Sequence, residues 1–367
     1  VRNKQTRSAP EVVELAVKIA NGYYSGFKLL SLLDLDHERP ELFFCTSNKT
    51  AGKTTFFNAY ILDKFISSGE KFLLLYRYSY EIENVIDKFF RDISQISDFN
   101  FNLEMTQERR DGGKYTELFY GEKSCGYAVS LSSVDYVKKA SHLFSDARII
   151  LFDEFMPESG KYLPHECDKL FAIHTAIARG RGQRRRYLPV VLISNPVTLL
   201  NPYYLTLGIS DRLQKNTHFL RGRGWVLEQG FNAAAANAQK ESGIYKAFEK
   251  TKIAAYGNQG VYLSDSDSFI SPIKNERARY VATFVVDNVS FGVKTYEKSG
   301  LLYIDTSVDM TAPLRICAEL ADFSPNFVMI NQYRYLFINW RNLFEVGSVR
   351  FRNGRAKSAF LKLLSYL

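Results

Sequence analysis

Cysteine, histidine, methionine and tryptophan are all scarce in this chain. Its 367 residues include 4 Cys, 5 His, 4 Met and 2 Trp. The cysteines are isolated from one another, at Cys45, Cys125, Cys167 and Cys317. Without paired spacing they form neither a disulfide framework nor a zinc-binding pattern, and we expect a protein of a reducing compartment.

Long hydrophobic runs are also missing. No segment approaches the roughly 18 consecutive apolar residues that a membrane-spanning helix needs. The opening stretch, "VRNKQTRSAPEVVELA", lacks the apolar core of a signal peptide. We therefore expect a protein without a membrane partner that resides in the cytoplasm.

Acidic residues are outnumbered by basic ones. The chain has 48 Lys and Arg against 39 Asp and Glu, which gives a formal net charge of +9. A basic balance of this size suits an acidic partner, and nucleic acid is the first candidate.

Apolar strands and helices alternate over the first two hundred residues. The predicted strands are apolar throughout, which is typical of a mostly parallel sheet covered by helices on both faces. The strands are expected at 42–45, 71–79, 147–155 and 188–196, the helices at 10–33, 53–67 and 81–94, and a hairpin at 115–133.

The composition changes twice further along the chain. A polar, Ala-rich stretch, "FNAAAANAQKESGIYKAFEKTKIAAYG", predicts helix, and strand patterns resume after about residue 278. We therefore expect an α/β domain over 1–205, a helical linker over 206–275 and a smaller α+β domain over 276–367.

"TSNKTAGKTT" (46–55) follows the first apolar strand and opens a helix. It matches the phosphate-binding pattern G-x-x-x-x-G-K-[ST] except that Ser47 replaces the first glycine. Gly52 lets the backbone pass close to phosphates, Lys53 supplies a positive charge, and Thr54 supplies a hydroxyl to Mg²⁺. The sequence thus predicts an ATP site formed by Ser47, Asn48, Lys49, Thr50, Ala51, Gly52, Lys53, Thr54 and Thr55.

Polar side chains end two later strands of the predicted sheet. "RIILFDEF" ends in Asp153, which we expect to hold Mg²⁺, and Glu154, which we expect to polarise the attacking water. "LISNP" ends in Asn195, a candidate sensor of the γ-phosphate. Together with the loop, these residues predict an ATP hydrolase.

Five arginines crowd the segment "ARGRGQRRR" (178–186). In ring-shaped ATPases an arginine from a neighbouring subunit completes the site. We expect Arg179, or else Arg181, to fill that role. Arg184, Arg185 and Arg186 are predicted to contact nucleic acid phosphates.

With "SNKTAGKT", "IILFDEF" and "LISNP" in this order, the chain resembles the large terminase or DNA-packaging ATPases of tailed bacteriophages. More narrowly, it resembles the encapsidation ATPase of small podophages with protein-primed genomes. The resemblance implies an ASCE-type P-loop fold with Glu154 as catalytic glutamate. It also implies a ring of five subunits that drives double-stranded DNA through a prohead portal in the host cytoplasm, with a structural RNA at the vertex.

In large terminases the C-terminal domain is a nuclease of the RNase H type, which holds two metals. Here Asp287, Asp305 and Asp309 end predicted strands, but the only acid after residue 322 is Glu345. We therefore expect a vestigial domain that binds nucleic acid through Arg350, Arg352 and Arg355. The alternatives are a terminase with an active nuclease, a replication-type DNA-dependent ATPase, and a nucleic-acid-binding module with a dead ATP site.

Overall fold

A computed structural model describes most of the chain from residue 24 onwards. The described residues are 24–94, 96, 101–159, 161–179, 185–197, 201–213, 217–230, 237, 241–248, 269–272, 275–286, 288–364 and 366. They fall into two compact units. The N-terminal unit takes Val1–Val197 with His218–Gly260, and the C-terminal unit takes Thr198–Thr217 with Val261–Leu367. Within the described residues, no helix has the length and apolar character to span a membrane.

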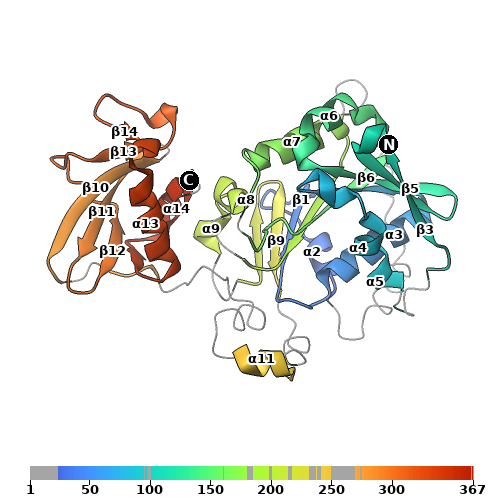
Figure 1. Ribbon diagram of the computed structural model, residues 1–367, viewed down its shortest axis with the longest axis horizontal. Coiled ribbons are helices and arrows are strands. Elements are labelled where there is room, and N and C mark those ends of the chain that lie inside the picture. Colours follow the sequence, from blue (N-terminus) through green and yellow to red (C-terminus); the bar gives the residue numbers. More distant parts are fainter. Residues whose placement is uncertain are drawn as a thin grey trace. The chain divides into compact units, whose positions relative to one another are not determined.

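A nine-stranded sheet organises the described part of the N-terminal unit (Figure 1). Its strands, in spatial order, are β3 (Met105–Arg110), β4 (Tyr115–Tyr120), β5 (Lys123–Ser130), β2 (Lys71–Tyr76), β6 (Ala147–Asp153), β7 (Val190–Ser194), β1 (Leu42–Thr46), β9 (Trp225–Gln229) and β8 (Phe219–Gly222). The six strands from β5 to β9 run parallel, and the antiparallel pairs lie at the two edges. The predicted α/β fold with a mostly parallel central sheet is confirmed.

Helices cover this sheet on both faces, which explains why its central strands are apolar throughout. Alternate residues of the strands, such as Phe43 and Cys45 of β1, pack in one core with Phe56 and Phe57. Figure 1 shows α3 to α5 on one side of the strands and α6 and α7 on the other. The helices of the unit are α2 (Phe27–Ser31), α3 (Lys53–Ser68), α4 (Val85–Phe89), α5 (Arg91–Ser94), α6 (Val134–Lys139), α7 (Glu166–Ile177) and α11 (Gly243–Phe248). Single 3₁₀ turns lie at η1 (Ser79–Ile82), η3 (Asp111–Gly113), η4 (Leu131–Ser133) and η5 (Ser141–Phe144).

The helix predicted over 81–94 is broken into η1, α4 and α5. A continuous helix requires the amide of Ile86 to bond the carbonyl of Ile82. Instead that amide donates to Oε1 of Gln107 at 3.0 Å, and Thr116 Oγ1 donates to the Ile82 carbonyl at 2.8 Å. Side chains of β3 and β4 therefore take the backbone groups that the helix would use, which the local sequence pattern does not reveal.

The helical linker predicted over 206–275 is wrong for residues 219–229. Strands β8 and β9 form a hairpin, and β9 pairs in parallel with β1. The pairing is non-local, because β9 lies almost two hundred residues after β1 in the chain. The Ala-rich part of the linker and the helix expected before residue 24 lie outside the described residues, apart from short pieces.

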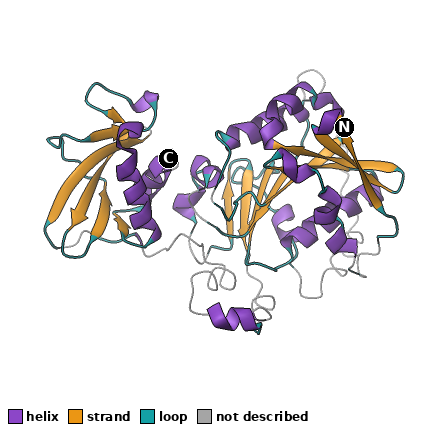
Figure 2. Cartoon of the chain, viewed as in Figure 1, coloured by secondary structure: helices purple, strands orange, loops and turns teal. Residues whose placement is uncertain are grey.

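The C-terminal unit is a smaller α+β domain, as predicted. Its six-stranded sheet has the order β14 (Val328–Met329), β13 (Arg315–Cys317), β10 (Ala278–Val286), β11 (Val289–Tyr296), β12 (Leu301–Asp305) and β15 (Val349–Phe351). The two long helices lie on one side of the sheet (Figure 2), and Phe337, Trp340 and Phe344 are the buried residues of the first of them. The helical elements are α8 (Pro202–Thr206), α9 (Ile209–Arg212), α13 (Arg334–Glu345), α14 (Gly354–Leu364), η7 (Leu320–Asp322) and η8 (Ile330–Tyr333).

A substitution at Gly126 of β5 can test how closely β5 packs against β2 in the central sheet. A Cβ atom there would overlap the backbone carbonyl oxygen of Phe72, which cannot move without breaking the ladder. Gly126→Ala should lower the stability of the N-terminal unit by about 1–3 kcal/mol. The measurement is the unfolding midpoint in urea, and Gly243→Ala is the control, since a Cβ at Gly243 meets no described atom within 4 Å. Equal midpoints for the two variants would contradict the expected overlap.

Candidate functional site

The loop between β1 and α3 explains why its first position does not need glycine. Ser47 has an ordinary negative φ, whereas Gly52 has φ +93° and Thr50 has φ +59°. Gly52 is the residue just before α3, where the first amide groups of the helix point outwards. Two backbone bonds hold the loop, from Tyr24 to the Ala51 carbonyl at 2.9 Å and from Gly230 to the Thr46 carbonyl at 2.7 Å. The pattern is therefore preserved at the position where its geometry requires glycine.

Lys53 places a buried ammonium group inside this loop. The residue is only 6% exposed, and burial lowers the pKa of its ammonium group. Nζ donates to the carbonyls of Ser47 at 3.0 Å and Asn48 at 3.1 Å, and to Oδ1 of Asn195 at 3.1 Å. All three acceptors are neutral oxygens, and the nearby Asp153 carboxylate acts on the charge without forming an ion pair with it. Beside a helix N-terminus, this arrangement fits an anion such as phosphate.

Thr54 and Asp153 meet at the same edge of the sheet. Thr54 Oγ1 donates to Oδ2 of Asp153 at 2.9 Å. Burial, followed by the charge of Glu154, raises the pKa of Asp153 to about 6. A carboxylate whose charge is disfavoured in this way gains from a nearby cation, and hydroxyl and carboxylate oxygens are the ligands that Mg²⁺ prefers. The residues present therefore fit a magnesium ion.

Glu154 follows directly after β6 and is exposed. Its φ of +56° lies in the left-handed region, and its amide donates to Oδ1 of Asp153 at 2.8 Å. A cavity of about 480 Å³ lies next to it, and its lining includes Thr54, Tyr76, Asp153 and Glu154. The acid pair thus borders a cavity that also reaches Thr54, the second residue of α3.

The strand order brings these groups together. β7 lies between β1, which leads into the loop, and β6, which carries the acids. Thr46 pairs with Ser194, and Asp153 pairs with Ile193, so the strand tips are level. A P-loop strand separated by one strand from an Asp-Glu strand defines an ATPase of the ASCE class, the P-loop class with an additional strand and a catalytic glutamate.

Comparison with known proteins gives the family. Residues 22–365 match the model of the Podovirus DNA encapsidation protein (Gp16), and the chain belongs to that family. It is 23% identical over 314 residues to the DNA packaging protein of Bacillus phage phi29, covering 84% of this chain and 89% of that protein. It is also 23% identical over 315 residues to the DNA packaging protein of Bacillus phage B103, with 84% and 92% covered.

Two solved structures share the whole fold. One is the bacteriophage Phi-29 viral genome packaging motor assembly, with a TM-score of 0.59 and 22% identity over 94% of this chain and 99% of that chain. The other is the Phi-28 gp11 DNA packaging motor, with a TM-score of 0.57 and 14% identity over 94% and 97%. The predicted resemblance to packaging ATPases is confirmed.

Other residues of the predicted site have different surroundings. Lys49 Nζ forms an ion pair with Oε1 of Glu158 at 2.6 Å. This ion pair directs the Lys49 side chain towards Glu158, which lies in the segment after β6. Lys49 also has a contact within the loop. Lys49 is therefore set apart from Lys53, although both belong to one loop.

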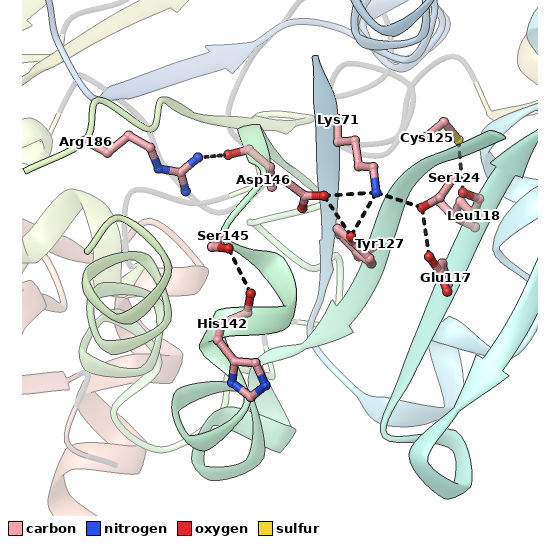
Figure 3. Close-up of polar contacts among 11 residues, drawn as sticks. Lys71, Glu117, Leu118, Ser124, Cys125, Tyr127, His142, Ser145, Asp146 and Arg186 are labelled. Atoms are coloured by element: carbon pink, nitrogen blue, oxygen red, sulfur yellow. Dashed lines mark hydrogen bonds and ion pairs between the residues drawn. The ribbon is translucent and has the colours of Figure 1, made fainter. Parts of the chain in front are cut away.

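The arginine segment begins where α7 ends. The backbones of Arg179 and Arg185 form an isolated antiparallel β-bridge, and both residues are exposed. Arg186 donates to the carbonyls of Ala147 and, at 3.0 Å, Ile177. Burial, followed by the charge of Arg148, lowers its pKa. Arg186 therefore anchors the segment to the start of β6 (Figure 3), and its contact with nucleic acid phosphates stays a prediction. Arg181 and Arg184 lie outside the described residues.

The C-terminal candidates divide in a similar way. Arg350 donates to the carbonyls of Gly347 and Val349, both at 2.7 Å, which gives it a structural contact, whereas Arg352 and Arg355 are exposed. Asp305 is buried and paired with Lys294 at 2.7 Å. Asp309 accepts from the amide of Thr311 at 2.9 Å, and Asp287 lies outside the described residues.

Arg77, which directly follows β2, was not among the predicted site residues. It donates to the backbone carbonyl of Glu154 at 3.2 Å and to both carboxylate oxygens of Glu166. The available signal was "LLLYRYS", where a charged residue ends an apolar strand. Strand tips of a parallel sheet meet at one edge, so this arginine called for the same interpretation as Asp153 and Asn195.

The two lysines of the loop should differ in their effect on nucleotide binding. Lys53→Ala removes the buried charge that we expect to face the phosphates and should weaken ATP binding about 100-fold, the equivalent of the roughly 3 kcal/mol upper range of charged hydrogen bonds. Lys49→Ala removes a half-exposed ion pair and should change the Kd by no more than about threefold. Titration of each variant with a fluorescent ATP analogue measures both. A Lys49→Ala loss as large as that of Lys53→Ala would assign Lys49 to the phosphates.

Proposed function

We propose that this chain is the ATP-hydrolysing subunit of a motor that moves double-stranded viral DNA into a prohead. The observation that carries the proposal is the buried ammonium of Lys53 beside the Thr54–Asp153 pair and Glu154. Family membership supplies the DNA encapsidation role. The solved motor with the same fold supports assembly into a ring.

Each residue of the site has a role in this proposal. Lys53 binds the β and γ phosphates, and Thr54 with Asp153 holds Mg²⁺, which supplies charge neutralisation when it is bound. Glu154 polarises the attacking water. Asn195, which already shares a hydrogen bond with Lys53, senses whether the γ-phosphate is present.

The arginine segment is proposed to act on a neighbouring subunit. Arg186 anchors it to Ala147, the first residue of β6, whereas Asp153 is the last residue of that strand. The 7 extended residues of β6 span about 20 Å. The anchored end of the segment therefore lies at the amino ends of the strands, whereas the proposed ATP site of the same subunit lies at their carboxyl ends. This separation favours Arg179 or Arg181 acting in trans. Arg185 is proposed to contact nucleic acid with Arg184.

The partners follow from the family resemblance. We propose a five-membered ring on the portal vertex in the host cytoplasm, with a structural RNA as a further partner. We propose that the ATPase region extends beyond the predicted limits 1–205 to include the hairpin of β8 and β9, which belongs to the nine-stranded sheet, and that the nucleic-acid-binding region covers 276–367.

The C-terminal unit is proposed to bind nucleic acid without cutting it. The meander β10-β11-β12 is extended by parallel β13 and β14 beside β10, an order that suits a vestigial RNase H-type sheet. Lys294 neutralises Asp305 and occupies the oxygen that a metal ion would need. The exposed Arg352 and Arg355 are proposed to contact phosphates.

The test is ATP hydrolysis by the purified protein, alone and with proheads plus linear duplex DNA, with nuclease-protected DNA scored in the same tubes. Wild type should show turnover that rises with proheads, together with protected DNA. Glu154→Gln should bind ATP normally but lose both signals, because the water is no longer polarised. Turnover that responds to DNA, ignores proheads and protects nothing would instead indicate a replication-type ATPase.

The trans arginine has its own test. Rings that mix Arg179→Ala subunits with Glu154→Gln subunits combine intact halves of a site at some interfaces. Hydrolysis should recover partly in the mixture, against a loss of about 10³-fold or more in either pure ring. The same experiment with Arg181→Ala decides between the two arginines. If neither mixture recovers activity, the trans assignment is wrong.

A further inference from the structure

Arg77 occupies a buried position between the end of β2 and the start of α7. Its side chain is 5% exposed, and that of Glu166 is fully buried. Nε and Nη2 donate to the two carboxylate oxygens of Glu166, both at 2.9 Å. Glu166 also accepts from the Leu163 amide at 2.8 Å, just before α7 begins. The pair is therefore a bidentate, fully desolvated ion pair that fixes the guanidinium plane.

The remaining donors of Arg77 point to the turn that carries Glu154. Nη1 donates to the Glu154 carbonyl at 3.2 Å, and Nη2 donates to the Phe155 carbonyl at 3.0 Å. Glu154 has φ +56°, a conformation that costs a non-glycine residue free energy and persists only where its surroundings enforce it. Arg77 provides that enforcement from a second strand.

Stability alone does not explain why charged residues stand here. A buried ion pair is often no more stabilising than apolar residues of the same volume, because both charges lose their hydration. What apolar residues cannot supply is a pair of donors aimed at consecutive carbonyls. Those carbonyls belong to Glu154 and to the residue after it, and Arg77 also lines the cavity next to Glu154.

We propose that Arg77 is a positioning residue for Glu154. Held by Glu166, it fixes the left-handed turn after β6 and thereby the direction in which the Glu154 carboxylate faces the attacking water. The role rests on the proposed function, because it presupposes that Glu154 polarises water. It predicts a defect in the hydrolytic step and not in nucleotide binding, since the contacts of Lys53 with the loop and of Thr54 with Asp153 remain.

The test is Arg77→Lys in the full-length chain, assayed with proheads and DNA. Lysine keeps the charge for Glu166 but cannot reach both carbonyls. We expect kcat to fall about 100-fold, the usual effect of a misplacement of about 1 Å in an active site. KM and the Kd for a fluorescent ATP analogue should stay within about threefold.

A second variant guards against misfolding. The double substitution Arg77→Met with Glu166→Gln removes both charges, so that no unpaired charge remains buried. The carboxamide oxygen introduced in place of the carboxylate still accepts the hydrogen bond of the Leu163 amide. Because the two carbonyls lose their donors, kcat should fall as in Arg77→Lys.

The control is Lys71→Met at the other end of the same strand. Lys71 Nζ pairs with Asp146 at 2.9 Å and donates to Ser124 and Tyr127 (Figure 3). The Lys71→Met variant shows how much thermal stability is lost when a partly buried ion pair of β2 is removed. Its kcat per folded subunit should stay within about twofold of wild type.

The outcomes separate the role of Arg77 from the proposed function. Wild-type turnover with an unchanged kcat in both Arg77 variants would overturn the positioning role and leave the motor intact. A loss of turnover in the Arg77 variants that disappears when kcat is calculated per folded subunit, as expected for Lys71→Met, would overturn the positioning role as well. Absence of turnover in wild type would overturn the motor, and the role of Arg77 with it.

Discussion

The burial of the Lys53 ammonium among neutral oxygens is the constraint on which the rest of the site depends. Moving an ammonium group out of water is costly unless its donors are satisfied, and here three oxygens satisfy them. Two of the acceptors are carbonyls that only a tight loop can bring to one point. The third, Asn195, requires that β7 lie beside β1. The loop, the strand order and the following helix are thus needed together to hold one charge ready for phosphate.

The sequence predicted which residues come together at the carboxyl ends of the central strands better than it predicted the secondary structure of 81–94 and 219–229. Lys53, Thr54, Asp153 and Asn195 could be found because each is a polar residue at the end of an apolar strand or the start of a helix, and Gly52 because it directly precedes that helix, and both features are local. The replacement of glycine by Ser47 was harmless, since that position has a negative φ. The residue types alone therefore indicated the members of the candidate site, and the strand order then brings them to the same ends of the strands.

What the sequence could not reveal depends on contacts between distant segments. The break after Ile82 is made by side chains of Gln107 and Thr116, and β9 becomes a strand by pairing with β1. No pattern within 81–94 or 219–229 records those partners. Arg186 and Arg350 were likewise predicted to contact nucleic acid on charge alone, yet carbonyl groups of the chain itself accept their hydrogen bonds. Net charge indicates an acidic partner but not which arginines are free to meet it.

Helix α7 runs between the carboxyl ends and the amino ends of the central strands. Its first residue, Glu166, is bonded to Arg77 and so to the turn of Glu154, while the residues after its end carry Arg179 and the anchor of Arg186 at the start of β6. Its 12 residues rise about 18 Å, close to the length of the strand it accompanies. A rigid helix of that length cannot shift at one end without the other. The turn that carries Glu154 and the start of the arginine segment are therefore connected through one helix, held at its first residue by Arg77 and after its last by Arg186.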